Sequence, residues 1–272
     1  KTFKETFQKA IRGLENGRPG LGFAKDFNKK SAEELCEMLK TASSERYFQL
    51  YEAIRKGVSL EKLNSITHVK EYFLQQMKEL VDLEEEMLKT IGSVPADELL
   101  IQAKKDGFSD KYLSKILKVS EKAIRDRRNA LGIKEAWLAV PVSGVDNANY
   151  YYSTYNAKDT SKASDNKKKI MILGGGPNRI GQGIEFDYCC CHAAMQLKEM
   201  GYETIIVNCN PETVSTDYDT SDKLYFEPVT TEDVLQIYEK EKPFGVIVQF
   251  GGQTPLNIAR ELQENGVNIL GT

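Results

Sequence analysis

The stretch from Lys169 to Tyr188 constrains the fold of this 272-residue chain more than any other feature. Its first five residues, Lys-Ile-Met-Ile-Leu, have the apolar character of a buried strand, and Gly174-Gly175-Gly176 follows directly. A strand, a glycine-rich turn and a helix form the opening unit of open α/β domains, and the turn leaves backbone N–H groups free to face an anion. The stretch therefore predicts an α/β domain that begins near residue 169.

The spacing within this loop argues against both common nucleotide-binding loops. The dinucleotide fingerprint needs glycine at its first, third and sixth positions, but the sixth position after Gly174 is Arg179. The phosphate loop needs Lys and then Ser or Thr after its second glycine, whereas Gly181 is followed by Gln182-Gly183. The loop therefore matches neither standard motif.

Strand and helix patterns alternate after the loop. The expected strands are 170–173, 204–207, 245–249 and a short one near Ile269, and the expected helices are 186–199, 231–241 and 254–265. Gly201 and Gly266 stand where helices should end. This alternation is the βαβ pattern of a mostly parallel sheet.

The first half of the chain has helical spacing of its apolar residues from Thr2 to about Lys134. Ser31 and Glu34 have the pattern of a capping box. The further N-cap candidates are Ser59, Thr67, Ser109 and Ser120, and the expected helix stops are Gly57, Gly92 and Gly132. We therefore expect an all-α helical domain over residues 1–140.

A segment without periodicity, residues 141–168, separates these two regions and is rich in Ser, Asn, Asp and Lys. Such a composition predicts a linker, with the α/β domain occupying residues 169–272. Four tyrosines in this segment carry too much apolar area to remain in water, so we expect them to attach it to a domain: Tyr150, Tyr151, Tyr152 and Tyr155.

Polar residues follow each predicted strand, at the edge where open α/β sheets bind ligands. They are Asn178, Arg179 and Gln182 after the first strand, Asn208, Asn210, Glu212, Thr213, Ser215, Thr216 and Asp217 after the second, and Gln249 and Gln253 after the third. An NAD site needs an acidic residue after the second strand, and Asn208 or Asn210 stands there instead. Dinucleotide binding is again disfavoured.

Residues 107–132 predict a helix, a tight turn and a second helix, with Arg125, Arg127 and Arg128 on the second. The shape and charge are those of a helix-turn-helix nucleic-acid-binding unit. The alternative is a hairpin of two helices whose basic face is solvated. The net charge of −3 argues against a polyanionic partner for the chain as a whole.

The cysteines and histidines suggest no metal site and no disulfide framework. The five cysteines are Cys36, Cys189, Cys190, Cys191 and Cys209, and the two histidines are His68 and His192. Three successive thiols permit a redox interpretation, but packing of small side chains between a helix and a sheet is favoured. No apolar run approaches the roughly 20 residues of a membrane span, so we expect a cytoplasmic protein.

Three long motifs in one order resemble the large subunit of the carbamoyl phosphate synthetase family. They are Gly174 to Tyr188, Val207 to Asp222 and Gln249 to Pro255. The resemblance implies that residues 169–272 form a Rossmann-like pre-ATP-grasp domain, before the second ATP-grasp unit, and that the helical part is the oligomerisation domain. Because the family's subunit is several times longer, it also implies that this chain is a fragment.

The family is a ligase that makes carbamoyl phosphate from bicarbonate, glutamine-derived ammonia and two ATP, for arginine and pyrimidine biosynthesis. The resemblance implies that ATP and Mg²⁺ or Mn²⁺ bind elsewhere in the full subunit, with no cofactor, metal ligand or catalytic residue in this fragment. The implied partners are the rest of the large subunit, the glutamine amidotransferase small subunit and further copies in a homo-oligomer. Neither nucleic acid nor membrane is an expected partner.

The resemblance also assigns positions in the α/β domain. Gly183, Glu185 and Glu212 match residues that line the family's carbamate tunnel. The matching glycine-rich loop comprises Gly174, Gly175, Gly176, Asn178, Arg179, Gly181 and Gln182. The alternative for the two acids is an ordinary helix N-terminal or loop-capping role.

Overall fold

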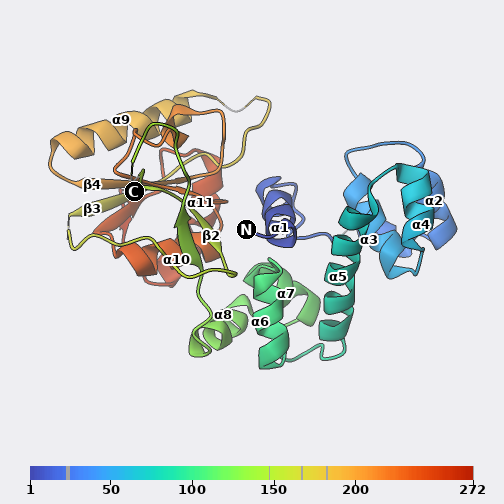
Figure 1. Cartoon of the computed structure of the whole chain (residues 1–272). Coiled ribbons are helices and arrows are strands. Elements are labelled where there is room, and N and C mark those ends of the chain that lie inside the picture. The colour runs from blue at the N-terminus through green and yellow to red at the C-terminus, as the bar shows by residue number, and fades with distance from the viewer. Residues whose placement is uncertain (23–24, 147, 167, 182, 272) are drawn as a thin grey trace. The chain divides into compact units, whose positions relative to one another are not determined.

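The structure, a computed structural model, describes residues 1–22, 25–146, 148–166, 168–181 and 183–271 (Figure 1). It divides into two compact units, Lys1–Ile133 and Lys134–Thr272. The first is helical and the second is α/β, so the predicted order of the two parts is confirmed. The structure divides the chain after Ile133, whereas the sequence pattern ends the helical domain at residue 140.

The helical unit contains eight α-helices and one 3₁₀-helix among its described residues. The α-helices are α1 (Phe3–Gly13), α2 (Ala32–Leu39), α3 (Arg46–Arg55), α4 (Leu60–Thr67), α5 (Glu71–Leu88), α6 (Asp97–Lys105), α7 (Asp110–Leu117) and α8 (Glu121–Ala130), and the 3₁₀-helix is η1 (Lys25–Lys29). Within the described chain, no helix is both long enough and apolar enough to span a bilayer.

Most of the predicted helix caps are confirmed. The Ser31 hydroxyl accepts from the Glu34 N–H at 3.2 Å, and the Glu34 carboxylate accepts from the Ser31 N–H at 2.7 Å. Ser59, Ser109 and Ser120 cap α4, α7 and α8. Thr67 is a wrong prediction: it is the last residue of α4, its hydroxyl donates to a carbonyl in the preceding turn, and α5 begins after Lys70.

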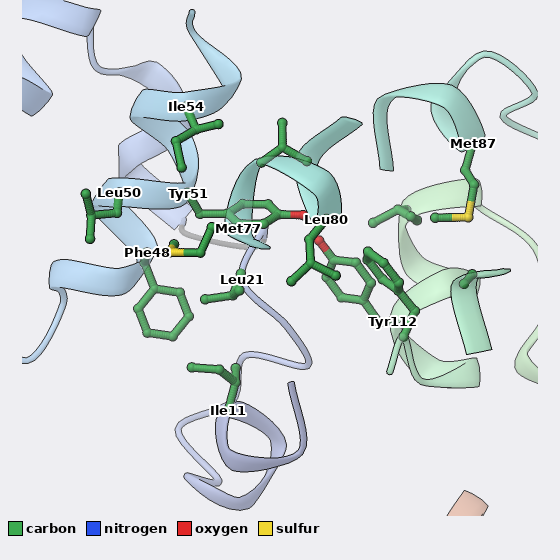
Figure 2. Close-up of a cluster of buried hydrophobic side chains, with 14 of the residues drawn as sticks. Ile11, Leu21, Phe48, Leu50, Tyr51, Ile54, Met77, Leu80, Met87 and Tyr112 are labelled. Atoms are coloured by element: carbon green, nitrogen blue, oxygen red, sulfur yellow. The ribbon is translucent and has the colours of Figure 1, made fainter. Parts of the chain in front are cut away.

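The hydroxyls of Tyr51 and Tyr112 point toward one another in the core of the helical unit (Figure 2), and the buried carboxylate of Glu84 binds both of them. The hydroxyls of Tyr51 and Tyr112 both donate to Oε2 of Glu84, at 2.7 and 2.6 Å, and Nη2 of Arg55 donates to its Oε1 at 2.6 Å. Burial, followed by the charge of Glu84, raises the pKa of both tyrosines. This cluster connects α3, α5 and α7, which are far apart in sequence.

The α/β unit is built on a seven-stranded sheet with the order β1-β2-β5-β4-β3-β6-β7. The strands are β1 (Ala136–Ala139), β2 (Tyr150–Thr154), β3 (Lys169–Leu173), β4 (Glu203–Asn208), β5 (Lys223–Phe226), β6 (Gly245–Ile247) and β7 (Ile269–Leu270). β1 and β2 are antiparallel, and every other neighbouring pair is parallel. The expectation of a mostly parallel sheet is confirmed.

Helices cover both faces of the sheet (Figure 1). The helices of this unit are α9 (Glu185–Glu199), α10 (Thr231–Glu241), α11 (Gln253–Glu264) and the 3₁₀-helix η2 (Val214–Thr216). Side chains alternate along β3: Met171 and Leu173 belong to the core with α10 and α11, and Ile172 belongs to the core with α9. β4 and β6 flank β3 on opposite sides, so the strand order reverses there and leaves a ligand-binding edge beyond Leu173.

Part of the predicted linker belongs to the sheet. Tyr151 in β2 is buried, pairs in register with Tyr225 of β5 and places its ring 5.5 Å from the Tyr225 ring. The Tyr155 hydroxyl accepts from Nε2 of Gln236 at 3.0 Å. The expected attachment through tyrosines is therefore present, but it takes the form of a strand whose partner, β5, lies more than 70 residues later.

Candidate functional site

The glycine-rich loop after β3 passes very close to neighbouring backbone and side chains. Gly174, Gly175 and Gly176 are all buried, and the Gly174 N–H donates to the carbonyl of Val207 at 2.9 Å. A Cβ added at Gly174 would lie 2.4 Å from Cγ of Asn208. The packing of the loop against β4 therefore requires glycine at position 174.

The side chain of Asn208 fills the loop from the end of β4. Its Oδ1 accepts from the N–H groups of Gly176 and Cys209, both at 2.9 Å, and its Nδ2 donates to Oγ of Ser215 at 3.0 Å. In a nucleotide-binding loop, such an N–H donates to a phosphate. Here the Gly176 N–H donates to Asn208 instead.

The first turn of α9 is bound to η2 through Asp187. Oδ2 of Asp187 accepts from the Ser215 N–H at 3.1 Å and lies 3.7 Å from Sγ of Cys191. Burial and then the Asp187 charge raise the pKa of Cys191 to about 12, and burial raises that of Cys190. High thiol pKa values disfavour a redox role for Cys190 and Cys191, and Cys190 packs in the core beneath α9 as the packing interpretation expects. Cys189 is exposed, so the packing interpretation does not hold for it.

The residues predicted to line a passage lie at this edge of the sheet. Glu185 is exposed in the first turn of α9, and a Cβ on Gly183 would lie 2.1 Å from its carboxylate. Glu212 is exposed in the segment after β4, and Nδ2 of Asn178 donates to its Oε2 at 2.8 Å. The structure thus brings Asn178 to Glu212 and Gly183 to Glu185.

The other predicted loop residues have different surroundings. Nη2 of Arg179 donates to the Gly175 carbonyl at 2.8 Å and to Oγ1 of Thr254 at 2.7 Å, which binds the loop to α11. Gly181 is exposed and has a φ of 82°. Gln182 lies outside the described residues.

Exposed apolar side chains occur on the same segments as these polar groups. Ile180 is fully exposed in the loop, Ile184 precedes α9, Tyr188 lies on α9 and Val214 begins η2, with exposed fractions of 84%, 62% and 55% for the last three. Large apolar residues grouped this way on a surface are typical of a face that another protein surface covers.

Two features of the loop differ from those of a phosphate-binding loop. The loop has no Walker lysine, and the Gly176 N–H is bound to Asn208. Among the described residues, no group of three or more His, Cys, Asp or Glu side chains is placed to hold a metal ion.

Sequence reasoning identified the edge but not the bonds that organise it. Asn208 and Ser215 were among the expected polar residues, whereas Asp187 was not. One sequence signal was available for Asp187, which stands in the first turn of a predicted helix where acids accept backbone N–H groups. The partner segment, however, is set by the tertiary fold.

The nucleic-acid alternative is not supported, although α7 and α8 do form the predicted helix-turn-helix shape. Arg128 is buried and its Nε donates to Oδ2 of Asp110 at 3.1 Å, while Nζ of Lys104 donates to Oδ1 at 2.8 Å. Arg127 pairs with Asp97 at 2.6 Å. These cations neutralise acids of their own unit, so they do not form a free basic face.

Two family models match the chain. Residues 1–132 match the carbamoyl-phosphate synthetase large chain oligomerisation domain, and residues 166–272 match the carbamoyl phosphate synthase preATP-grasp domain. These matched ranges fall within the helical and the α/β unit, respectively.

Curated relatives match over the entire chain. The carbamoyl phosphate synthase large chains of Archaeoglobus fulgidus, Halomonas eurihalina and Pseudomonas aeruginosa are 50%, 51% and 51% identical to it. Each alignment covers 100% of this chain and 26% of the relative, so the chain spans about a quarter of their length. The chain therefore belongs to the carbamoyl phosphate synthase large-chain family, a family of ligases.

Proposed function

We propose that this chain is a middle section of the large subunit of a glutamine-hydrolysing carbamoyl phosphate synthetase. The whole enzyme joins bicarbonate and glutamine-derived ammonia with two ATP, in the cytoplasm, and supplies arginine and pyrimidine synthesis. Its ATP and Mg²⁺ or Mn²⁺ sites lie in other parts of the large subunit, and its ammonia comes from an amidotransferase small subunit. This section contributes an assembly domain and a Rossmann-like pre-ATP-grasp domain, and it is not catalytic alone.

Within that enzyme, the carboxyl edge of the α/β sheet forms part of the wall of the carbamate passage. The observation that carries this proposal is the combination of a loop whose N–H is bound within the protein with exposed acids and exposed apolar residues on the same segments. Glu185 and Glu212 are the acids, and Ile180, Ile184 and Val214 are among the apolar residues. Carbamate decomposes in bulk water, so a passage needs apolar walls that exclude solvent and ionisable groups that manage its proton and hydration.

Substitution of Gly183 in the complete synthetase tests the passage. The φ of Gly183 lies outside the left-handed region, and the three atoms nearest to an added Cβ all belong to the flexible end of the Glu185 side chain. Gly183→Ala should therefore retain activity, whereas the ring of Gly183→Phe should obstruct the passage. We expect carbamoyl phosphate formation in Gly183→Phe to fall more than about tenfold, about 1.4 kcal/mol, while bicarbonate-dependent ATP hydrolysis survives. Equal loss of partial and overall reactions would show that the residue is structural.

The helical unit serves homo-oligomer assembly in this proposal. Rings from three helices form a connected series on its surface: Tyr47, Phe7, Phe3, Phe73 and Tyr72. Tyr47 and Tyr72 are 48% and 59% exposed, which supports a second copy of the chain as the covering surface. Light scattering should show dimers or larger species that dissociate in Tyr72→Ser. A strict monomer at high concentration would contradict this role.

A further inference from the structure

Asn208, the last residue of β4, forms hydrogen bonds with three residues through its side chain. The residue is 1% exposed. Gly176 of the loop and Cys209 donate to its oxygen, and its nitrogen donates to Ser215 of η2. Two N–H donors require the oxygen on their side, so the carboxamide has one orientation.

The loop and this side chain are shaped for one another. Gly176 has a φ of 84°, a conformation that favours glycine and directs its N–H toward the carboxamide. The close approach of Asn208 to Gly174 leaves no room for a Cβ there. A neutral carboxamide oxygen thus takes the place that an anion occupies in a phosphate-binding loop.

The hydrogen bonds continue from Ser215 to the first turn of α9, because the Ser215 N–H donates to Asp187. Along the chain, Gly176 and Asp187 are therefore fixed on either side of Gly183 and Glu185. The network holds both ends of the segment that carries these two passage residues.

The same hydrogen bonds hold the segment that carries Glu212, which is the second segment of the proposed passage wall. Asn208 and Ser215 are fixed on either side of Glu212, whose carboxylate accepts from Asn178 of the glycine-rich loop. The two segments are consequently joined twice, once beneath the surface through Asn208 and once at the surface through Asn178 and Glu212.

We infer that Asn208 is a positioning residue of the carbamate passage: its carboxamide binds the loop amide that would otherwise face an anion, and it fixes both wall segments. The inference rests on the proposed function. It adds that the geometry of the wall depends on a buried amide that need not touch carbamate.

Two substitutions in the complete synthetase test this role. Asn208→Leu keeps the number and branching of the side-chain heavy atoms but removes the acceptor and the donor, whereas Asn208→Asp keeps an acceptor for both N–H groups and can accept from the Ser215 hydroxyl. We expect the ratio of carbamoyl phosphate formed to ATP hydrolysed to fall about tenfold or more in Asn208→Leu, since small misplacements at a site have effects of this size. Asn208→Asp should restore most of the ratio.

Thr204→Val is the matched control for lost stability. Thr204 is also buried in β4, but at the opposite end, where its hydroxyl exchanges hydrogen bonds of 3.0 and 3.1 Å with Asp222. This variant should melt at a lower temperature and keep the wild-type ratio. If Asn208→Leu does not fold, Ser215→Ala removes one bond of the network and should lower the ratio to a smaller extent.

Hydrogen–deuterium exchange separates failure of the inference from failure of the proposed function. Asn208→Leu should accelerate exchange in peptides that cover 174–181 and 209–217, without change in the helical unit. Unchanged exchange in these peptides, or a wild-type ratio in a folded Asn208→Leu enzyme, would overturn the inference. Faster exchange together with an unaffected Gly183→Phe enzyme would overturn the passage assignment, and with it the role of Asn208 in that passage.

Discussion

The two ends of the α/β sheet hold their strands by different means. At the amino end, buried Glu241 of α10 accepts from Lys223 at 3.0 and 3.1 Å, from Lys169 at 3.3 Å and from the Tyr225 hydroxyl. At the carboxyl end, the corresponding network is centred on a neutral amide, Asn208. Charges fix the end that carries no proposed function, whereas Glu185 and Glu212 at the other end are exposed.

This difference suggests that stability and function are divided between the ends. The lysines at the amino end also donate to carbonyls of the preceding segment, Lys169 to Ser164 at 3.0 Å and Lys223 to Lys162 at 3.2 Å. The amino end therefore binds the chain entering the sheet, while the carboxyl end presents the passage residues. Substitutions at the two ends should affect different properties.

The largest expected effect on stability is that of Glu241→Gln. It leaves Lys169 and Lys223 buried beside a neutral amide, so the free energy of unfolding should fall by about 3–5 kcal/mol. Denaturant unfolding followed by Trp137 fluorescence reports on this unit, because Trp137 is the one tryptophan and packs 4.9 Å from Tyr225. Glu264→Gln, in an exposed pair with Arg260, is the control and should change little. A loss below about 1 kcal/mol in Glu241→Gln would contradict the account.

Alkaline pH should weaken the amino end next. Burial and then the Glu241 charge raise the pKa of Tyr225, so the folded protein keeps a proton that the unfolded chain loses above about pH 10. Stability should be unaffected by this group below that pH and fall above it, by up to about 1.4 kcal/mol per pH unit. The free energy of unfolding should be measured for wild type and Tyr225→Phe at moderately and at strongly alkaline pH. It should decline less with pH in Tyr225→Phe than in wild type. An identical decline in both proteins would exclude this cause.

Glu212→Gln tests the carboxyl end of the sheet, where we expect a loss of activity and little loss of stability. Glutamine can still accept from Asn178, and position 212 is exposed, so the free energy of unfolding should change by less than about 0.5 kcal/mol. The lost charge should nevertheless reduce carbamoyl phosphate formation in the complete synthetase by about tenfold, if the carboxylate manages the carbamate proton. Stability by denaturant titration and product formation are the two measurements. A stability loss with unchanged product formation would reverse the proposed division.

Local sequence patterns predicted the elements whose signals are local. α10 begins and ends at the expected residues because Thr230 caps it and its apolar residues have helical spacing. β3 and β4 were recognisable as apolar runs that are buried on both faces. The strands β1, β2 and β5 were not predicted, since four or five residues with mixed burial become strands only through pairing with distant segments.

The site was predictable as a location rather than as a bonding network. The edge followed from the polar residues after each predicted strand, and the acids followed from the family resemblance. Which N–H group Asn208 binds depends on the register of β3 with β4, in which Leu173 pairs with Val207. That register is a tertiary property, and no residue spacing in the sequence specifies it.

The response of this chain to ATP tests most directly the central claim that its glycine-rich loop is filled by the protein's own Asn208. A ligand stabilises the folded state only in proportion to its binding, by about 2.7 kcal/mol at one hundred times its Kd. Millimolar ATP with Mg²⁺ should leave the melting temperature of the chain unchanged. An increase of several degrees that is lost in variants of Gly174 or Gly176 would contradict it.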